Sequence, residues 1–134
     1  MTVFELLFYD DNFRISKNDL IISESIEKQL SIDCKLKIII NGRIFYDDWI
    51  YPLELYYEYL KWNESFQKGE HTNFQYNTVD NYENPLFEFL FDEDIKQWKI
   101  DGKFKNYEEK SYFSDEEIVN FFEQFIQLIS THIC

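Results

Sequence analysis

The sequence predicts an α+β protein, in which a mostly antiparallel sheet built from hairpins packs against two main helices. Two observations concern the helices: a proline opens an amphipathic stretch over about 52–63, and a wide apolar face runs over about 115–132. The third is an Asn-Gly pair between two apolar runs, which is the strongest short-range sign of a hairpin. A chain of 134 residues suits a single domain, 1–134.

The first strands are expected in the N-terminal third. Residues 3–9 alternate in the manner of a strand with one buried face. Residues 35–46 alternate on both sides of the Asn-Gly pair, and both turn residues tolerate the positive φ angles that a tight hairpin needs. Residues 18–30 fit either a strand or helical i, i+4 spacing, and a short helix or irregular turn near 25–30 is favoured.

The first long helix is predicted from its start and its periodicity. Pro52 suits the first turn, because its missing N–H has no helical partner to lose there. Tyr57 lies opposite the apolar stripe and is expected at the surface, flanked by Glu54 and Glu58. One stripe of the helix is expected to face the core: Leu53, Tyr56 and Leu60.

The second half of the chain is expected to add strands and the last helix. Residues 104–113 could form an edge strand of the sheet. Ser114 and Glu117 have capping-box spacing, in which the serine hydroxyl accepts from the N3 amide and the glutamate reaches back. Three other strand predictions precede them: 74–79, 86–91 and 95–100, of which 86–91 is the strongest.

Composition limits the kinds of partner. The formal charge is −13, which disfavours binding to nucleic acid or to an anionic membrane and favours a basic protein. No apolar run approaches the roughly 20 residues needed to cross a bilayer. The first ten residues contain an acid and no base, unlike a secretory signal. Cys34 and Cys134 are expected to be free thiols of a cytoplasmic protein, monomeric or homodimeric.

The sequence carries no clear catalytic motif. The acidic pairs and triplets lack EF-hand spacing and are better explained as solvated turns than as metal ligands. His71 and His132 are expected to be ordinary loop or surface histidines. Cys34 is expected to be a buried structural thiol, although Lys35 beside it leaves a reactive thiolate as an alternative. No catalytic residue, cofactor or metal site is predicted, and the protein is expected not to be an enzyme.

Residues 69–95 are acidic and aromatic. They hold seven carboxylates and six aromatic rings and no lysine or arginine. Aromatic anchors ringed by carboxylates are suited to binding a basic protein. Together with the exposed face expected on the first long helix, this stretch predicts a partner-binding surface formed by Glu54, Tyr57, Glu58, Tyr82, Glu83, Glu88, Asp92, Glu93 and Asp94.

In size and charge the whole chain resembles the small acidic immunity proteins of bacteria. Those proteins neutralise basic nuclease or other toxin domains, and they span many folds without a shared motif. The resemblance implies an immunity protein that plugs the active site of a toxin or binds beside it. A local similarity to an uncharacterised bacterial single-domain family rests on the run 37–45, the run 52–55 and the pair Lys61-Trp62.

Three other hypotheses stay open at this level. A small-ligand-binding or enzymatic domain would need a pocket lined by tyrosine, tryptophan and carboxylates. A homo-oligomeric structural module would pair its exposed aromatic side chains, and its mass would depend on concentration. A nucleic-acid mimic would space its acids along one face as phosphates are spaced.

Overall fold

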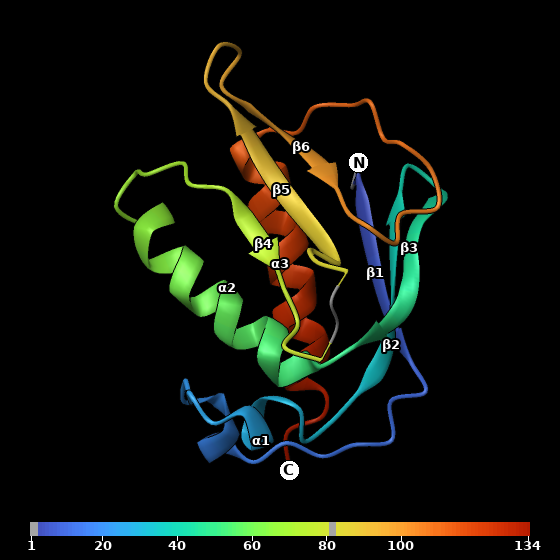
Figure 1. Cartoon of the computed structure of the whole chain (residues 1–134), viewed down its shortest axis with the longest axis vertical. Helices are drawn as coiled ribbons and strands as arrows, with labels where there is room; N and C mark the ends of the chain where they lie inside the picture. The colour runs from blue at the N-terminus through green and yellow to red at the C-terminus, as the bar shows by residue number, and fades with distance from the viewer. Residues whose placement is uncertain (1–2, 81–82) are drawn as a thin grey trace.

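The computed structural model describes residues 3–80 and 83–134 and confirms the α+β fold class (Figure 1). The elements follow one another in the order β1 (Phe4–Tyr9), η1 (Lys17–Leu20), α1 (Ile26–Gln29), β2 (Cys34–Ile40), β3 (Arg43–Ile50), α2 (Pro52–Phe66), β4 (Phe74–Tyr76), β5 (Phe87–Asp92), β6 (Gln97–Asp101) and α3 (Asp115–Ser130).

The strands form two antiparallel sheets, β1-β2-β3 and β4-β5-β6, where the sequence indicated one. In the first sheet Phe4 of β1 lies opposite Ile40 of β2. In the second sheet Phe89 of β5 lies between Phe74 of β4 and Ile100 of β6. Figure 1 shows β1, β2 and β3 on the right, β4, β5 and β6 in front of α3, and α2 on the left.

The β2–β3 hairpin turns at the predicted Asn-Gly pair. Asn41 and Gly42 have φ angles of 49° and 82°, the left-handed conformations that a two-residue hairpin turn requires. The register shifts in β2 after Ile38. Two consecutive residues of β3, Phe45 and Tyr46, are therefore both buried, as expected beside a bulge.

Aromatic rings from α3 fill the core between the two sheets. Phe121 meets Phe89 edge-on with ring centroids 4.8 Å apart, and Phe122 meets Phe74 in the same way at 4.9 Å. Edge-to-face packing suits the ring quadrupoles, so a chain without alanine can still fill its interior closely. The helix α3 packs against β1 and β6, and α2 packs against β4.

Residues 104–113 do not form the predicted edge strand. Phe113 pairs with Trp98 of β6 through two backbone hydrogen bonds of 2.8 Å, as an isolated bridge. Before it, the chain crosses to the first sheet, where the amide of Asn106 donates to the carbonyl of Phe45 at 2.8 Å. The segment therefore covers the edge of β3 instead of extending the second sheet.

The predicted helices are present, although α2 is somewhat longer and α3 somewhat shorter than expected. The capping box of α3 is confirmed. The Ser114 hydroxyl accepts from the amide of Glu117 at 3.2 Å, and the Glu117 carboxylate accepts from the amide of Ser114 at 2.9 Å. The short helix α1 confirms the favoured interpretation of residues 25–30.

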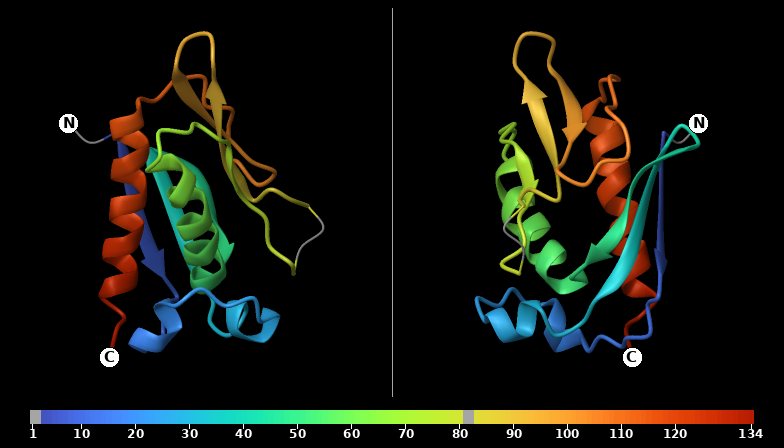
Figure 2. Two further views of the ribbon diagram at one scale, coloured as in Figure 1. Left: turned by 90° about the vertical axis from the view of Figure 1, so that its left-hand side faces the viewer. Right: turned by 45° about the vertical axis from the view of Figure 1, so that its right-hand side comes forward.

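The tip of the β5–β6 hairpin and the η1–α1 segment lie at opposite ends of the molecule (Figures 1 and 2). The first turn of α2 lies toward the η1–α1 end. Across the described ranges 3–80 and 83–134, no helix combines the length and the apolar character needed to cross a membrane.

Candidate partner-binding surface

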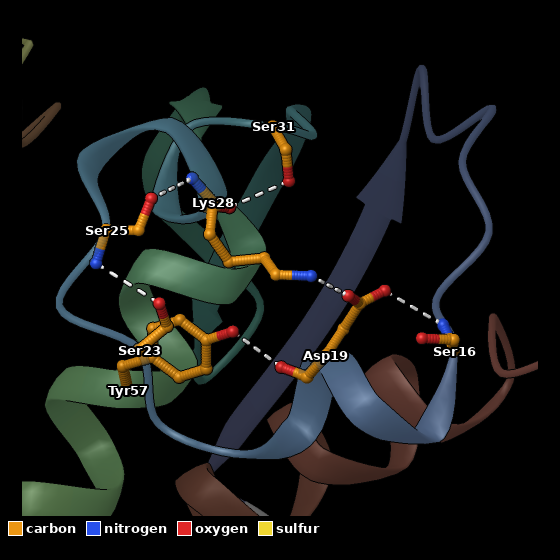
Figure 3. Close-up of polar contacts among 7 residues, drawn as sticks. All are labelled: Ser16, Asp19, Ser23, Ser25, Lys28, Ser31 and Tyr57. Atoms are coloured by element: carbon orange, nitrogen blue, oxygen red, sulfur yellow. Dashed lines mark hydrogen bonds and ion pairs between the residues drawn. The ribbon is translucent and has the colours of Figure 1, made fainter.

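Tyr57 is buried, and the prediction that it forms an exposed contact patch is wrong. It is 1% exposed because it lies four residues after the buried Leu53, on the same side of α2, and because η1 and α1 pack against this helix. The Tyr57 hydroxyl donates to the backbone carbonyl of Asp19 at 2.6 Å (Figure 3). The covering residues 17–29 lie far earlier in the chain, so the periodicity of α2 could not reveal them.

Glu54 is buried as well, at 2% exposure, so it does not belong to a surface. Its Oε1 accepts from the Tyr76 hydroxyl at 2.9 Å, and its Oε2 accepts from the amide of Val79 at 3.1 Å. The carboxylate lies in the first turn of α2, near the positive end of the helix dipole. Glu54 therefore ties α2 to β4 and to the chain that follows β4.

Glu58 is the predicted α2 residue that keeps a partly open side chain. Burial raises the pKa of its carboxyl group, and the nearby Lys61 acts in the opposite direction. The Lys61 Nζ lies 3.8 Å from a Glu58 oxygen and 3.6 Å from a Glu24 oxygen. Glu58 therefore borders the η1–α1 segment, within reach of a partner at that end.

One of the three predicted acids at the tip of the β5–β6 hairpin, Asp92, helps to form the turn. Asp92 accepts from the amide of Asp94 at 2.9 Å, as turn-forming aspartates commonly do. The exposed Glu93 carboxylate lies 3.3 Å from the Lys96 Nζ. This tip adds negative charge but offers few large apolar side chains, with Ile95 the exposed example.

The remaining predicted residues lie along and before β5. Glu88 is half-buried, and its carboxylate accepts from the Gln75 side-chain amide at 2.9 Å. Glu83 is exposed, and Tyr82 falls outside the described residues. The predicted residues therefore do not form one surface, because the hairpin tip and the first turns of α2 lie toward opposite ends (Figure 1).

A pocket that the sequence did not predict lies near the junction of β3 and α2. Its volume is about 330 Å³. Asp48 belongs to β3 and Asp80 follows β4, so the tertiary structure alone brings these two carboxylates to one cavity. In the sequence the Asp-Asp pair at 47–48 indicates only a turn. We call this cavity the acidic pocket; it is lined by Tyr46, Asp48, Trp49, Tyr51, Thr78, Asp80, Leu86 and Phe104.

Each carboxylate of the acidic pocket uses one oxygen within the protein. Asp48 Oδ1 accepts from the amide of Trp49 at 2.7 Å, and Asp80 Oδ2 accepts from the Tyr51 hydroxyl at 2.5 Å. The bond to Asp80 and burial raise the pKa of Tyr51 to about 12, so this hydroxyl stays protonated at neutral pH. The other oxygen of each carboxylate has no hydrogen-bond partner among the described residues, and none of the lining residues is basic.

Two exposed apolar side chains lie at or next to the acidic pocket. Trp49 is 46% exposed and Val79 is 59% exposed. The Lys35 ammonium lies 5.3 Å from the Trp49 ring, on the outer face of the first sheet. Open carboxylates beside exposed apolar groups are suited to a partner that presents a cation on an apolar stem.

A comparison with family models shows to which protein family the chain belongs. Residues 11–134 match the model of a family described as a domain of unknown function, DUF7878. The chain belongs to this family. Neither a curated protein nor a solved structure matches it. The matched part of this DUF7878 protein contains every helix and strand after β1 and all the residues that line the acidic pocket.

His71 of the DUF7878 protein joins the chain after α2 to the start of α3. Its Nε2 lies 2.9 Å from an Asp115 oxygen, and its ring stacks on Phe91 with centroids 4.3 Å apart. The other Asp115 oxygen accepts from the Trp98 indole N–H at 2.8 Å. The residues that line the groove beside this pair include no serine, threonine or cysteine, so they offer no hydroxyl or thiol nucleophile for the histidine to activate.

His132 holds the C-terminus against the segment that follows β1. Its Nε2 lies 2.8 Å from an Asp11 oxygen, and its ring stacks on Phe13 at 4.2 Å. The amide of Ile15 donates to the carbonyl of His132 at 2.9 Å. Both histidines of the DUF7878 protein thus connect distant parts of the chain, which the sequence did not indicate.

Cys34 is a fully buried free thiol in β2, which confirms the structural interpretation. Burial raises the pKa of this thiol far above its ordinary value, and the nearby Asp11 and Asp33 add to the effect. Cys134 is free and exposed. Of the described residues, no three His, Cys, Asp or Glu side chains are grouped so that they could hold a metal ion.

Proposed function

We propose that this protein is a protein-binding module that acts in the cytoplasm as an immunity protein. It binds and neutralises a basic bacterial toxin domain, such as a nuclease. The observation that carries the proposal is the acidic pocket, where Asp48 and Asp80 each keep an open oxygen among aromatic residues and no base. That combination fits a lysine or arginine side chain of a partner protein.

Long-range electrostatics would speed the encounter. The formal charge of −13 attracts a positively charged domain, and such steering raises association rates by about ten- to a thousandfold at low salt. The range of the attraction is about 8 Å at physiological ionic strength. The exposed acids Glu93 and Asp94 at the hairpin tip add to this field without belonging to the acidic pocket.

Short-range contacts at the acidic pocket would then slow dissociation. A cationic side chain that enters the pocket would replace its hydrogen bonds to water with hydrogen bonds to the open oxygens of Asp48 and Asp80. The aliphatic part of that side chain would lie against the apolar surface of the pocket. Trp49 and Val79 provide exposed apolar area for the neighbouring part of the partner. The toxin would be inhibited by occlusion of its active site or by binding beside it.

Where a secreted protein with a basic C-terminal domain is encoded next to this gene, the test uses that domain, with binding rates measured at increasing salt. Asp48→Asn combined with Asp80→Asn removes both charges but keeps an oxygen acceptor for the Trp49 amide and the Tyr51 hydroxyl. We expect this variant to dissociate about tenfold faster or more, which corresponds to about 1.4 kcal/mol. The association rate of the unmodified protein should fall as salt rises.

The matched control removes the same charge elsewhere. Glu93→Gln combined with Asp94→Asn at the hairpin tip should slow association slightly and leave dissociation unchanged. Equal dissociation rates for the two double variants would exclude the acidic pocket as the anchor. A gene neighbourhood that encodes no secreted protein with a basic C-terminal domain would remove the support for immunity itself.

The volume of the acidic pocket also supports a second candidate function, the binding of a small cationic ligand. A cavity of about 330 Å³ falls at the lower end of the range of about 300–1,000 Å³ that is typical of ligand pockets. Calorimetric titration with arginine methyl ester distinguishes the two. Micromolar binding that is lost in the Asp48→Asn, Asp80→Asn variant would favour the small ligand, whereas a protein hot spot should hold a single free side chain only weakly.

A further inference from the structure

Three isoleucines that lie close together in the sequence are exposed in the η1–α1 segment. Ile21 is 70% exposed, Ile22 is 42% exposed and Ile26 is 58% exposed. Isoleucine is among the residues most often buried, so three exposed isoleucines in one short segment are candidates for an interaction site. We call these three residues the isoleucine surface.

Hydrogen bonds around Asp19 hold the backbone that carries the isoleucine surface. The Asp19 carboxylate is paired with the Lys28 ammonium and accepts from the amide of Ser16 at 2.9 Å, while its backbone carbonyl accepts from Tyr57 (Figure 3). These contacts join η1, α1 and α2. The segment is therefore fixed by polar contacts and not by burial of its own isoleucines.

Serine side chains complete this arrangement on α1. Ser25 caps the helix by accepting from the amide of Lys28 at 3.2 Å, and the Ser31 hydroxyl donates to the carbonyl of Lys28 at 2.7 Å (Figure 3). Leu20 and Ile32, on either side of the isoleucine surface, are half-buried and pack against the core. A surface that is ordered before binding loses less conformational entropy when a partner docks.

The charges on the segment indicate what kind of partner fits. Glu24 and Glu27 are exposed next to the isoleucines, and residues 21–27 include no lysine or arginine. The nearby Lys28 is paired with Asp19, and Lys61 lies between Glu24 and Glu58. Two copies of this chain that met through the isoleucine surface would bring like charges together, which disfavours self-association.

We infer that the isoleucine surface docks into an apolar groove, rimmed by lysine or arginine, on the same basic protein that fills the acidic pocket. This inference rests on the proposed function. Both sites adjoin α2, because Tyr51, the residue before α2, lines the acidic pocket, and η1 and α1 pack against α2. One partner can therefore contact both, with isoleucines as the apolar centre and Glu24 and Glu27 at the edge.

Site-specific photo-cross-linking tests the inference in the cells that make the protein. Benzoylphenylalanine replaces Ile21 at the isoleucine surface, Val79 beside the acidic pocket, or Ile95 at the hairpin tip, all of them exposed apolar positions. The adduct is identified by mass spectrometry. We expect one basic protein to be cross-linked from positions 21 and 79 and not from position 95.

Each other outcome separates the inference from the function on which it rests. A basic partner cross-linked from position 79 and not from position 21 would overturn the inference and leave the proposed function standing. A cross-link from position 21 to a second copy of this chain would also overturn it. No cross-linked partner from any position would count against both.

A kinetic measurement with the identified partner gives the magnitude. Ile21→Ser combined with Ile26→Ser should raise the dissociation rate at least tenfold, because truncation of apolar anchors acts mainly on dissociation. The control Ile95→Ser alters another exposed isoleucine, in the β5–β6 hairpin at the far end, and should leave the rate within twofold of the unmodified protein. Equal rates for both variants would overturn the inference.

Discussion

Glu54 and Tyr76 are joined by a hydrogen bond of 2.9 Å in the interior of the protein, where both side chains are buried. The Tyr76 oxygen also accepts from the amide of Tyr51 at 3.0 Å, and Glu54 also accepts from the amide of Val79 at 3.1 Å. One carboxylate and one phenol therefore connect the start of α2, β4 and the chain that leads to Asp80. This network positions two walls of the acidic pocket.

Removal of the buried carboxylate should destabilise the protein. Glu54→Ala leaves the buried Tyr76 hydroxyl and the part-buried Val79 amide without an acceptor, and an unsatisfied buried group costs about 1–3 kcal/mol. We expect a loss of at least about 2 kcal/mol in urea unfolding, and a smaller loss for Glu54→Gln, which keeps one acceptor oxygen. Glu93→Ala, at an exposed position, is the control; if it were as destabilising as Glu54→Ala, the network would contribute nothing specific.

Alkaline pH should weaken the contact between Tyr51 and Asp80. The folded-state pKa of Tyr51 is raised to about 12 from 10.0, so its stabilising contribution is complete below pH 10 and is lost as the pH rises toward 12. Burial also raises the pKa of Tyr46 and Tyr76, which adds to the alkaline loss. The stability difference between the unmodified protein and Tyr51→Phe, measured by urea unfolding, should shrink above pH 10; a constant difference would contradict this account.

Acid should weaken the pair that holds the η1–α1 segment. The hydrogen bond from Lys28 and the amide of Ser16 lower the pKa of Asp19 below 3.8. Its contribution is therefore present above that value and is lost as the pH falls through the lowered folded-state pKa. The stability difference between the unmodified protein and Asp19→Asn should be present at neutral pH and should disappear on acidification. Glu27→Gln, an exposed change in the same segment, is the control and should change the stability little at neutral pH.

The two cysteines should differ sharply in reactivity. Burial raises the pKa of Cys34 and shields it from reagents, whereas Cys134 is exposed. Brief treatment of the native protein with iodoacetamide should modify Cys134, and Cys34 should react only after unfolding by urea. Peptide mass spectrometry measures both sites. Rapid modification of Cys34 in the native protein would support the reactive alternative that its neighbour Lys35 had suggested.

Local patterns in the sequence were sufficient for several elements. The Asn41-Gly42 turn and the Ser114–Glu117 capping box were predicted correctly, because their hydrogen bonds and φ angles depend on residues a few positions apart. The strand predicted over 104–113 failed because Asn106 binds the edge of β3. That competition between two distant edges has no local signature.

The candidate site shows the same division. The placement of Tyr57 opposite the apolar stripe of α2 was wrong, because Tyr57 lies four residues after Leu53 on the same side of the helix. The periodicity of α2 also could not show that η1 and α1 would pack against it. The acidic pocket was missed because its two carboxylates are far apart in the sequence. Asp48 belongs to β3 of the first sheet and Asp80 follows β4 of the second sheet, so only the tertiary structure brings them together. The exposure of Ile21 was equally hidden, since residues 18–30 fit a strand or a helix.

The sequence by itself determined the α+β class, the strong negative charge, the tight β2–β3 turn and the start of α3. These features follow from composition and from interactions between near neighbours along the chain. The tertiary structure decided which acids are buried, which lie open beside aromatic groups, and which isoleucines stay exposed. Burial and pocket formation depend on contacts between segments far apart in sequence, so a carboxylate such as Glu54 becomes structural and one such as Asp80 stays available to a partner.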